Sequence, residues 1–324
     1  MKTSKKPKAT TASPFDFLYD EETNNEKSSS YYLEEGVSGL GLCLCLIQLF
    51  ILTRKDLRND IVFFFITVIT ICDVVFSSGT LLWSLIEYLA QDGCSKKYLY
   101  FHQIVRTGII LTQQMAKNIS LLSIILVSVL KIFKIKVRSV YSGRVITILV
   151  FLIYTIWSLC SIYHYKIDLV EVNFKNCHTS FSYEFSIDPD FYQFQQSVND
   201  KITILLFILL SIIFAINIIK LLVARCTQNG INDHTTLIAM LSLTFFFSEF
   251  FSFAIFSLDK FLLREFFIIP GYLIQMLTNI FTVLSIVWRC CICYLASPEY
   301  AATARKPEEI LSIQMVEVLH DSQD

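Results

Sequence analysis

Residues 102–138 read HQIVRTGIILTQQMAKNISLLSIILVSVLKIFKIKVR, an almost continuous apolar run that also carries charged and amide side chains. A run of this length predicts a membrane-spanning helix, because about 20 residues cross the hydrocarbon core of a bilayer. A charge at the centre of such a helix costs at least about 2.5 kcal/mol of insertion free energy. We therefore expect Lys117 and its polar neighbours to face other protein or a wet cavity, and this helix must have neighbours.

Six other apolar runs supply these neighbours. Hydrophobic residues make up 54% of the 324-residue sequence and charged residues only 17%, which disfavours a soluble domain and favours a polytopic membrane protein. The runs are long enough to span, and their mostly short links favour antiparallel packing. The seven runs are Gly36–Thr53, Ile61–Leu89, His102–Leu130, Val145–His164, Ile202–Val223, Thr235–Leu258 and Phe266–Leu295. The sequence predicts an all-α membrane protein with seven spans and one long polar connector at about Tyr165–Lys201.

Lysine and arginine gather in one set of loops and helix ends, which predicts that this side of the membrane is cytoplasmic. Seven spans then place the N-terminus outside the cell and the C-terminal tail inside, with the plasma membrane as the expected location. The net charge is −1 and no basic tract of the kind that nucleic-acid binding needs occurs, so nucleic acid is not an expected partner. The basic set comprises Arg54, Lys55, Arg58, Lys131, Lys134, Lys136, Arg138, Arg144, Lys220, Arg225, Arg289, Arg305 and Lys306.

Several local motifs resemble those of a receptor family. LTRKDLR at 52–58 follows the first apolar run, and ICD at 71–73 lies in the second. The sixth run opens with TTLI at 235–238 and continues to FSE at 247–249, and the seventh closes with CYLASPEY at 293–300. In their order and spacing these motifs resemble the nematode Srw chemoreceptors, which are rhodopsin-like G-protein-coupled receptors similar to FMRFamide-type peptide receptors.

The resemblance implies a rhodopsin-like seven-transmembrane receptor. Such a receptor binds an extracellular ligand in the helix bundle, here a neuropeptide, a chemosensory cue or another small molecule, and signals to a heterotrimeric G protein. We expect neither an enzyme nor a cofactor or metal site. The chain divides into an extracellular N-terminal segment at 1–33, expected to be disordered, a receptor domain at 34–296 and a cytoplasmic tail at 297–324.

Four features differ from the rhodopsin-like pattern. Lys131 stands where the third helix usually ends in an acid–arginine pair, and Cys45 replaces an asparagine of the first helix. Phe251 replaces the sixth-helix proline, and the seventh helix lacks an Asn-Pro-x-x-Tyr motif. Because the missing proline removes the simplest cause of a kink, one alternative is a receptor-like protein that no longer signals. A transporter or channel is another, but the inverted repeats or Gly/Pro-broken helices that it predicts are not found.

Polar residues inside the predicted helices form the candidate ligand site. Gln113 and Lys117 are four residues apart, so they share one helix face. The functional interpretation is the floor of a ligand pocket, and the alternative is a salt bridge from Lys117 to Glu249 or Asp73 that only holds helices together. The residues expected to bind the ligand are Gln113, Gln114, Lys117, Asn118, Glu249 and Gln275.

Asp73 lies in the middle of the second run, where a carboxylate without a partner is unfavourable. The resemblance implies that it faces the bundle and holds a sodium ion or a water network, with Asn279 and Ser285 nearby. It also implies a disulfide between Cys94 and Cys177, which lie in connectors on the oxidising side.

The two membrane surfaces carry further candidate sites. Lys131, Lys134, Lys136 and Arg138 form a basic inner rim expected to contact anionic membrane lipids or the G protein. Cys290, Cys291 and Cys293 lie at the inner interface, where they are either palmitoylation sites or packing residues. Acidic and aromatic residues of the connector, among them Asp188 and Asp190, suit a basic peptide or form a solvated loop without a partner.

Overall fold

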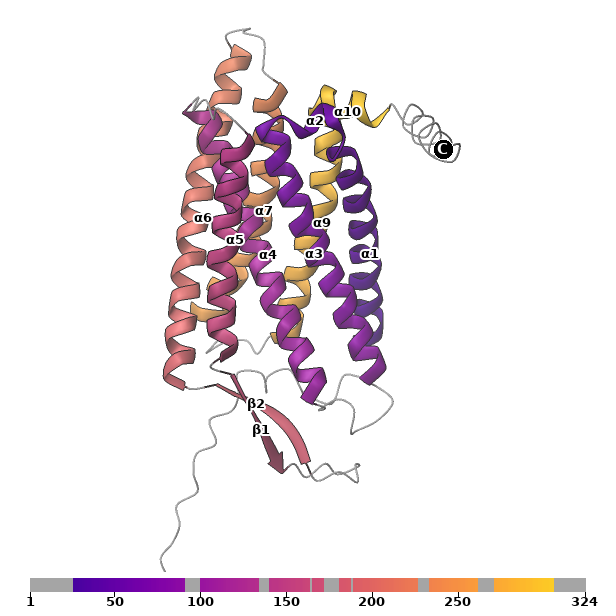
Figure 1. Cartoon of the computed structure of the whole chain (residues 1–324), viewed down its shortest axis with the longest axis vertical. Coiled ribbons are helices and arrows are strands. Elements are labelled where there is room, and N and C mark those ends of the chain that lie inside the picture. The colour runs from indigo at the N-terminus through magenta and orange to yellow at the C-terminus, as the bar shows by residue number, and fades with distance from the viewer. Residues whose placement is uncertain are drawn as a thin grey trace, which may run out of the picture.

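The molecule is a bundle of long helices, each running antiparallel to the one before it along the chain (Figure 1). The structure is a computed structural model, and it describes residues 26–90, 100–133, 140–163, 165–171, 181–187, 189–226, 233–261 and 271–305. The bundle helices are α1 (Glu26–Leu52), α3 (Ile61–Ala90), α4 (Tyr100–Ile132), α5 (Val140–Tyr163), α6 (Pro189–Cys226), α7 (Asp233–Phe261) and α9 (Gly271–Ala296). Within these ranges, six helices are long and apolar enough to span a membrane, and α5 adds the shorter apolar stretch Val145–Trp157. The predicted all-α seven-helix bundle is confirmed.

Two helices begin earlier than their apolar runs. α1 begins at Glu26, inside the segment expected to be disordered, and α6 begins at Pro189 instead of near Ile202. Proline suits the first turn of a helix because the backbone N–H that it lacks would have no partner within the helix there. At 38 residues, α6 is about 57 Å long, well beyond the ~30 Å hydrocarbon core. Hydropathy identifies only the part of a helix that lies in lipid, so the polar turns were missed.

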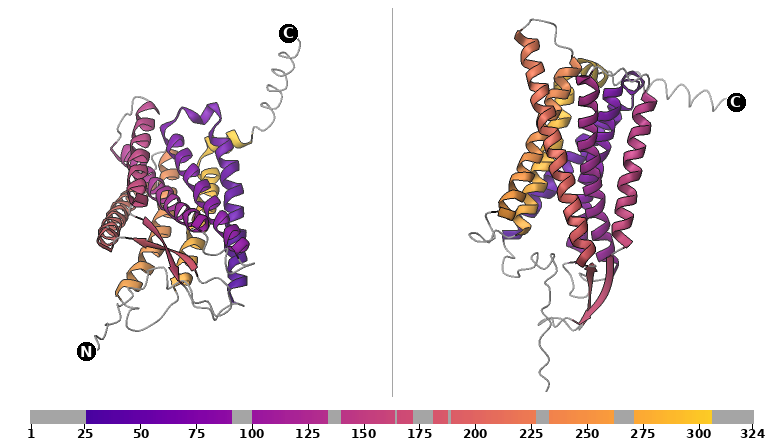
Figure 2. Two further views of the ribbon diagram at one scale, coloured as in Figure 1. Left: turned by 60° about the horizontal axis from the view of Figure 1, so that its bottom comes forward. Right: turned by 90° about the vertical axis from the view of Figure 1, so that its left-hand side faces the viewer.

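The connector between α5 and α6 contains a strand pair that the sequence analysis did not predict. β1 (Tyr165–Glu171) and β2 (Phe181–Ile187) pair antiparallel, with Tyr165 opposite Ile187 and Glu171 opposite Phe181. Both strands alternate apolar and polar residues over part of their length, which is the usual signal of a half-buried strand. The pair lies across the end of the bundle away from α2 and α10 (Figures 1 and 2).

Two short helices, α2 (Lys55–Arg58) and α10 (Pro298–Ala304), lie at the opposite end of the bundle. The Ser297 hydroxyl caps α10 by accepting a hydrogen bond from the Tyr300 backbone N–H (3.2 Å), and Pro298 occupies the first turn. Tyr300 is buried in the core, and this burial raises the pKa of its hydroxyl. The Arg54 guanidinium donates to the Thr303 carbonyl oxygen. The CYLASPEY motif thus anchors α10 to the bundle.

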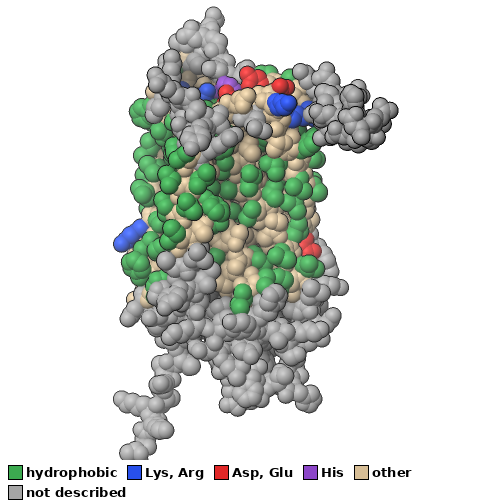
Figure 3. Space-filling view, in the orientation of Figure 1, with side chains coloured by type: hydrophobic (Ala, Val, Ile, Leu, Met, Phe, Trp, Pro, Cys, Tyr) green, Lys and Arg blue, Asp and Glu red, His purple; other side chains and the backbone are tan. Residues whose placement is uncertain are grey.

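The apolar residues divide between a core and an outer surface. Phe63, Phe65, Ile124 and Leu241 belong to a buried cluster shared by α3, α4 and α7. Large hydrophobic side chains also cover the outside, with Ile153 of α5 65% exposed. Figure 3 shows this apolar surface along the length of the bundle, with charged groups gathered at the end that carries α2 and α10. Such a large exposed apolar area marks a contact with lipid.

Gly41 marks the close approach of α1 and α9. A Cβ atom there would lie 3.2 Å from Cγ1 of Val283, whereas one at Gly39 on the same helix would meet nothing within 4 Å. We expect Gly41→Leu to lower the free energy of unfolding by about 1–3 kcal/mol through overpacking, measured by thermal unfolding of the purified protein. Gly39→Leu gains the same helix propensity and is the matched control. Equal effects of both substitutions would contradict the close packing of α1 on α9.

Candidate functional site

Among the described residues, four charged side chains lie deep inside the bundle, each from a different helix. They are Asp73 of α3, Lys117 of α4, Glu249 of α7 and Arg289 of α9, and they form two ion pairs. The Lys117 ammonium lies 3.2 Å from a Glu249 carboxylate oxygen, which ties α4 to α7. This is the salt bridge that the sequence offered as the alternative to a ligand contact at Lys117.

The Asp73–Arg289 pair is bidentate. The guanidinium donates to one carboxylate oxygen at 2.7 Å and to the other at 3.1 Å, and both side chains are buried. The guanidinium carbon also lies 4.2 Å from the centroid of the Phe245 ring of α7. Charge-assisted paired hydrogen bonds and a cation–π contact suit a guanidinium, which is more weakly hydrated than an ammonium. This pair therefore joins α3, α7 and α9.

A small cavity of about 20 Å³ lies among all four charges. A cavity needs about 10–15 Å³ to hold one water, so this space is of water size and too small for an organic ligand. Its other walls include the hydroxyls of Ser120, Ser248 and Thr282 and the ring of Phe245. These charges are therefore surrounded by protein and not by lipid, as expected from the free-energy cost of inserting Lys117 into a bilayer.

Arg289 corrects one part of the sequence analysis. The sequence predicts that Arg289 belongs to the cytoplasmic basic set, but the residue lies within α9 and is 4% exposed. Its guanidinium supplies the positive charge at Asp73, where the resemblance implied a sodium ion or waters. The resemblance also placed Ser285 and Asn279 in that network. Ser285 is buried, and its hydroxyl donates to the Thr282 carbonyl (2.9 Å). Asn279 lies about two helical turns from Ser285 on α9. The missed signal was the set of charges that lie more than four residues from either end of an apolar run. These are the acids Asp73 and Glu249 and the bases Lys117 and Arg289, which indicate two pairs.

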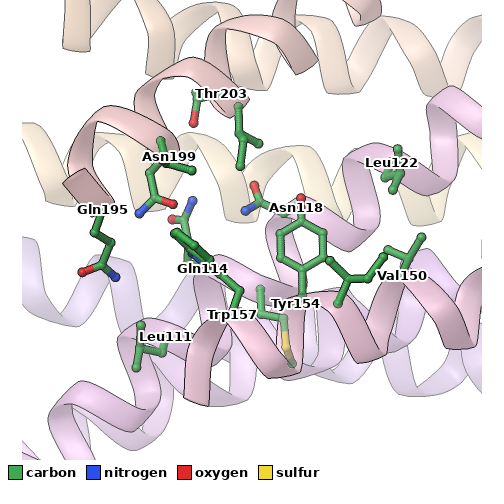
Figure 4. A pocket seen from close by; sticks show the side chains of 14 residues that line it. Leu111, Gln114, Asn118, Leu122, Val150, Tyr154, Trp157, Gln195, Asn199 and Thr203 are labelled. Carbon is green, nitrogen blue, oxygen red and sulfur yellow. The ribbon is translucent and has the colours of Figure 1, made fainter. Parts of the chain in front are cut away.

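The polar residues of α4 divide between two faces, because successive residues of a helix are about 100° apart. The Gln113 amide donates to the Phe76 carbonyl and to the Thr80 hydroxyl of α3, each at 3.0 Å. Gln114 and Asn118 instead line a separate cavity between α4, α5 and α6 (Figure 4). Gln113 and Lys117 thus contact neighbouring helices, whereas the next face of α4 borders open space.

This second cavity, here called the α4–α5–α6 cavity, has a volume of about 270 Å³. Apolar and uncharged polar side chains line it, and Tyr154 and Trp157 of α5 provide its aromatic surface (Figure 4). Its fourteen lining residues are Leu111, Gln114, Met115, Asn118, Leu122, Val150, Ile153, Tyr154, Trp157, Gln195, Val198, Asn199, Ile202 and Thr203. A concave, mostly apolar site with a few polar groups is typical of small-molecule binding.

The remaining candidates fall partly outside the described residues. Cys94, Cys177, Lys134, Lys136, Arg138 and Asp188 all lie there, as does the side chain of Gln275. Lys131 is half-buried near the end of α4 that lies beside α2 and α10. The disulfide, the basic rim and the acidic loop therefore stay predictions. Within the described ranges, no group of three or more His, Cys, Asp or Glu side chains is arranged to hold a metal ion.

The three cysteines near the end of α9 differ in their surroundings. Cys293 is buried, and its sulfur accepts a hydrogen bond from the Gln48 amide of α1 (3.2 Å). The Cys290 sulfur lies 3.9 Å from the sulfur of Cys45, also on α1. Cys291 is exposed. Two of the three therefore pack between α1 and α9, and palmitoylation stays a prediction to which Cys291 offers the accessible thiol.

Seven antiparallel helices around paired charges, with a ligand-sized cavity beside them, define a polytopic membrane protein of the receptor-like helical class. The sequence matches the family described as Serpentine type 7TM GPCR chemoreceptor Srw over residues 32–308, and the chain belongs to this family. The predicted Srw membership is confirmed, and the family supports a chemosensory receptor embedded in the membrane. A comparison with curated proteins gives no match.

Removing one partner of the Asp73–Arg289 pair should destabilise the protein strongly, because the other charge is left buried without a partner. We expect Asp73→Leu or Arg289→Met alone to cost about 3–5 kcal/mol of unfolding free energy. The double variant should lose much less, since it replaces the whole pair with apolar side chains. Thermal unfolding of the four proteins in nanodiscs measures this coupling. Losses that simply add in the double variant would argue against the pair.

Proposed function

We propose that this chemoreceptor binds an extracellular ligand within the helix bundle and signals to a heterotrimeric G protein through a change in the position of α7. The observation that carries the proposal is the set of charged contacts that hold α7. Glu249 pairs with Lys117 of α4, and Phe245 covers the Arg289 guanidinium of α9. Buried ion pairs are either formed or broken, so they give the bundle discrete arrangements instead of a continuous range.

α4 supplies the connection between a ligand and α7. Gln114 and Asn118 line the α4–α5–α6 cavity, and Lys117 lies between them in sequence on the adjacent face. A small rotation or shift of α4 on ligand binding therefore changes the geometry of the Lys117–Glu249 pair. A ligand that binds more tightly to the arrangement with α7 displaced shifts the equilibrium toward it.

The end of the bundle that carries α2 and α10 is the proposed G-protein face. The first turn of α7 is held there by His234, whose Nε2 lies 3.8 Å from an Asp60 carboxylate oxygen and 3.9 Å from one of Glu299. The Lys220 ammonium of α6 donates to the Ile132 carbonyl at the end of α4 (3.0 Å). Movement of α7 alters the His234 contacts first, which would open a crevice for a partner beside the bond between α6 and α4. The basic residues of this end support its assignment to the cytoplasm.

Removing the charge of Glu249 should raise ligand-independent signalling, because Lys117 then no longer holds α7. We expect Glu249→Gln to increase basal nucleotide exchange on a heterotrimeric G protein severalfold in membranes with matched receptor amounts. The swap variant Lys117→Glu with Glu249→Lys restores an ion pair and should return exchange toward the wild-type level.

Lys201→Met, at an exposed lysine of α6, is the control and should leave basal exchange unchanged. Exchange that is the same in all four proteins, tested against each class of G protein, would contradict signalling through this pair.

A further inference from the structure

The α4–α5–α6 cavity offers a ligand hydrogen bonds but no charge. None of its fourteen lining side chains, all within the described residues, is ionisable at neutral pH. Figure 4 shows the amides of Gln114 and Asn118 from α4 and that of Asn199 from α6 directed into the same space. The Tyr154 and Trp157 rings face them from α5. One part of the cavity is therefore rich in amides, and the other is apolar and aromatic.

Lys117, Glu249, Asp73 and Arg289, the four charges of the two buried ion pairs, are already paired with each other. Lys117 is the charged residue of α4 nearest in sequence to the cavity-lining Asn118, and its ammonium is engaged by Glu249 on the adjacent face. An ionised ligand in this cavity would lose its hydration without gaining a partner of opposite charge, which costs several kcal/mol. An uncharged ligand loses much less, because the amides replace its hydrogen bonds to water. The cavity therefore selects for an uncharged ligand.

The cavity reaches the lipid-facing surface between α5 and α6. Ile153 lines it and is 65% exposed on the outside of the bundle, and Thr203 of α6 is exposed as well. Toward the end that carries the strand pair, the Trp157 ring of α5 contacts the Phe194 ring of α6, with centroids 6.5 Å apart. This aromatic contact narrows the route by which a ligand could reach the cavity from the end that carries the strand pair. The apolar outer faces of both helices make the bilayer the open side.

We propose that the α4–α5–α6 cavity binds a small, uncharged amphiphile that enters from the bilayer between α5 and α6. Such a ligand has a short hydrocarbon part and one or two hydroxyl, carbonyl or amide groups. The volume of about 270 Å³ lies just below the range of roughly 300–1,000 Å³ that is typical of small-molecule sites, which fits a small ligand. The inference rests on the proposed function in taking this cavity as the ligand site of the receptor, and it names the ligand class.

The test uses three photoreactive probes of one shape: a diazirine-bearing octanol and the corresponding octanoic acid and octylamine. The full-length protein in phosphatidylcholine nanodiscs is irradiated with each probe at equal membrane concentration, and the adducts are mapped by mass spectrometry. We expect the alcohol to label cavity-lining residues at least about fivefold more than either ionised probe. Cavity labelling by the acid or the amine equal to that by the alcohol would overturn the proposal.

Two variants and a matched control test the location. Val150→Trp fills the cavity and should abolish alcohol labelling there, whereas Ile148→Trp on the exposed face of α5 should leave it unchanged. Asn118→Leu keeps the side-chain size, removes an amide and should reduce labelling about fivefold without a bulky insertion. Alcohol adducts that persist in both cavity variants, or that spread evenly over lipid-facing residues, would overturn the site. Because labelling needs no G protein, a labelled cavity without nucleotide exchange refutes the signalling proposal alone.

Discussion

Pairing of charges inside the membrane is the constraint on which this bundle depends. A lone charge at the depth of Asp73 or Lys117 is too costly to leave in lipid, and each has an opposite charge on another helix. Together the pairs and Phe245 connect α3, α4, α7 and α9 around one water-sized cavity. The remaining helices, α1, α5 and α6, carry much of the exposed apolar surface. The arrangement of the bundle thus follows from the need to shield these four charges from lipid as well as from apolar packing.

α4 is the helix on which binding and transmission meet. One face carries Gln113 and Lys117, which are bonded to α3 and α7, and the next carries Gln114 and Asn118, which border the α4–α5–α6 cavity. A ligand in this cavity and the ion pair that holds α7 are therefore separated by the width of one helix. This short distance gives a receptor of the Srw family a direct physical route between its proposed ligand site and α7. It requires no proline kink in α7, where Phe251 takes that place.

The seven helices were predictable because a bilayer demands about 20 apolar residues from every span, whatever its neighbours. A Lys117–Glu249 bridge was foreseen as an alternative for the same reason, since both residues carry charges within spans. The role of Arg289 was not predicted, because a cationic residue near the end of an apolar run is assigned to the membrane surface. Its partner Asp73 is also 216 residues away in sequence. Helix geometry separates Gln113 from Gln114, but which helix each face meets depends on packing around the bundle. The strand pair was not predicted, because the alternation of apolar and polar residues is short there and lies in a polar connector.

Single-particle electron microscopy of the full-length protein in a lipid nanodisc is the most direct test of the buried pairing. We expect density for the Arg289 guanidinium within hydrogen-bond distance of both Asp73 carboxylate oxygens, and density for the Lys117 ammonium beside Glu249. Density that directs Arg289 toward the lipid headgroups at the α10 end, with Asp73 bonded to other groups, would contradict it.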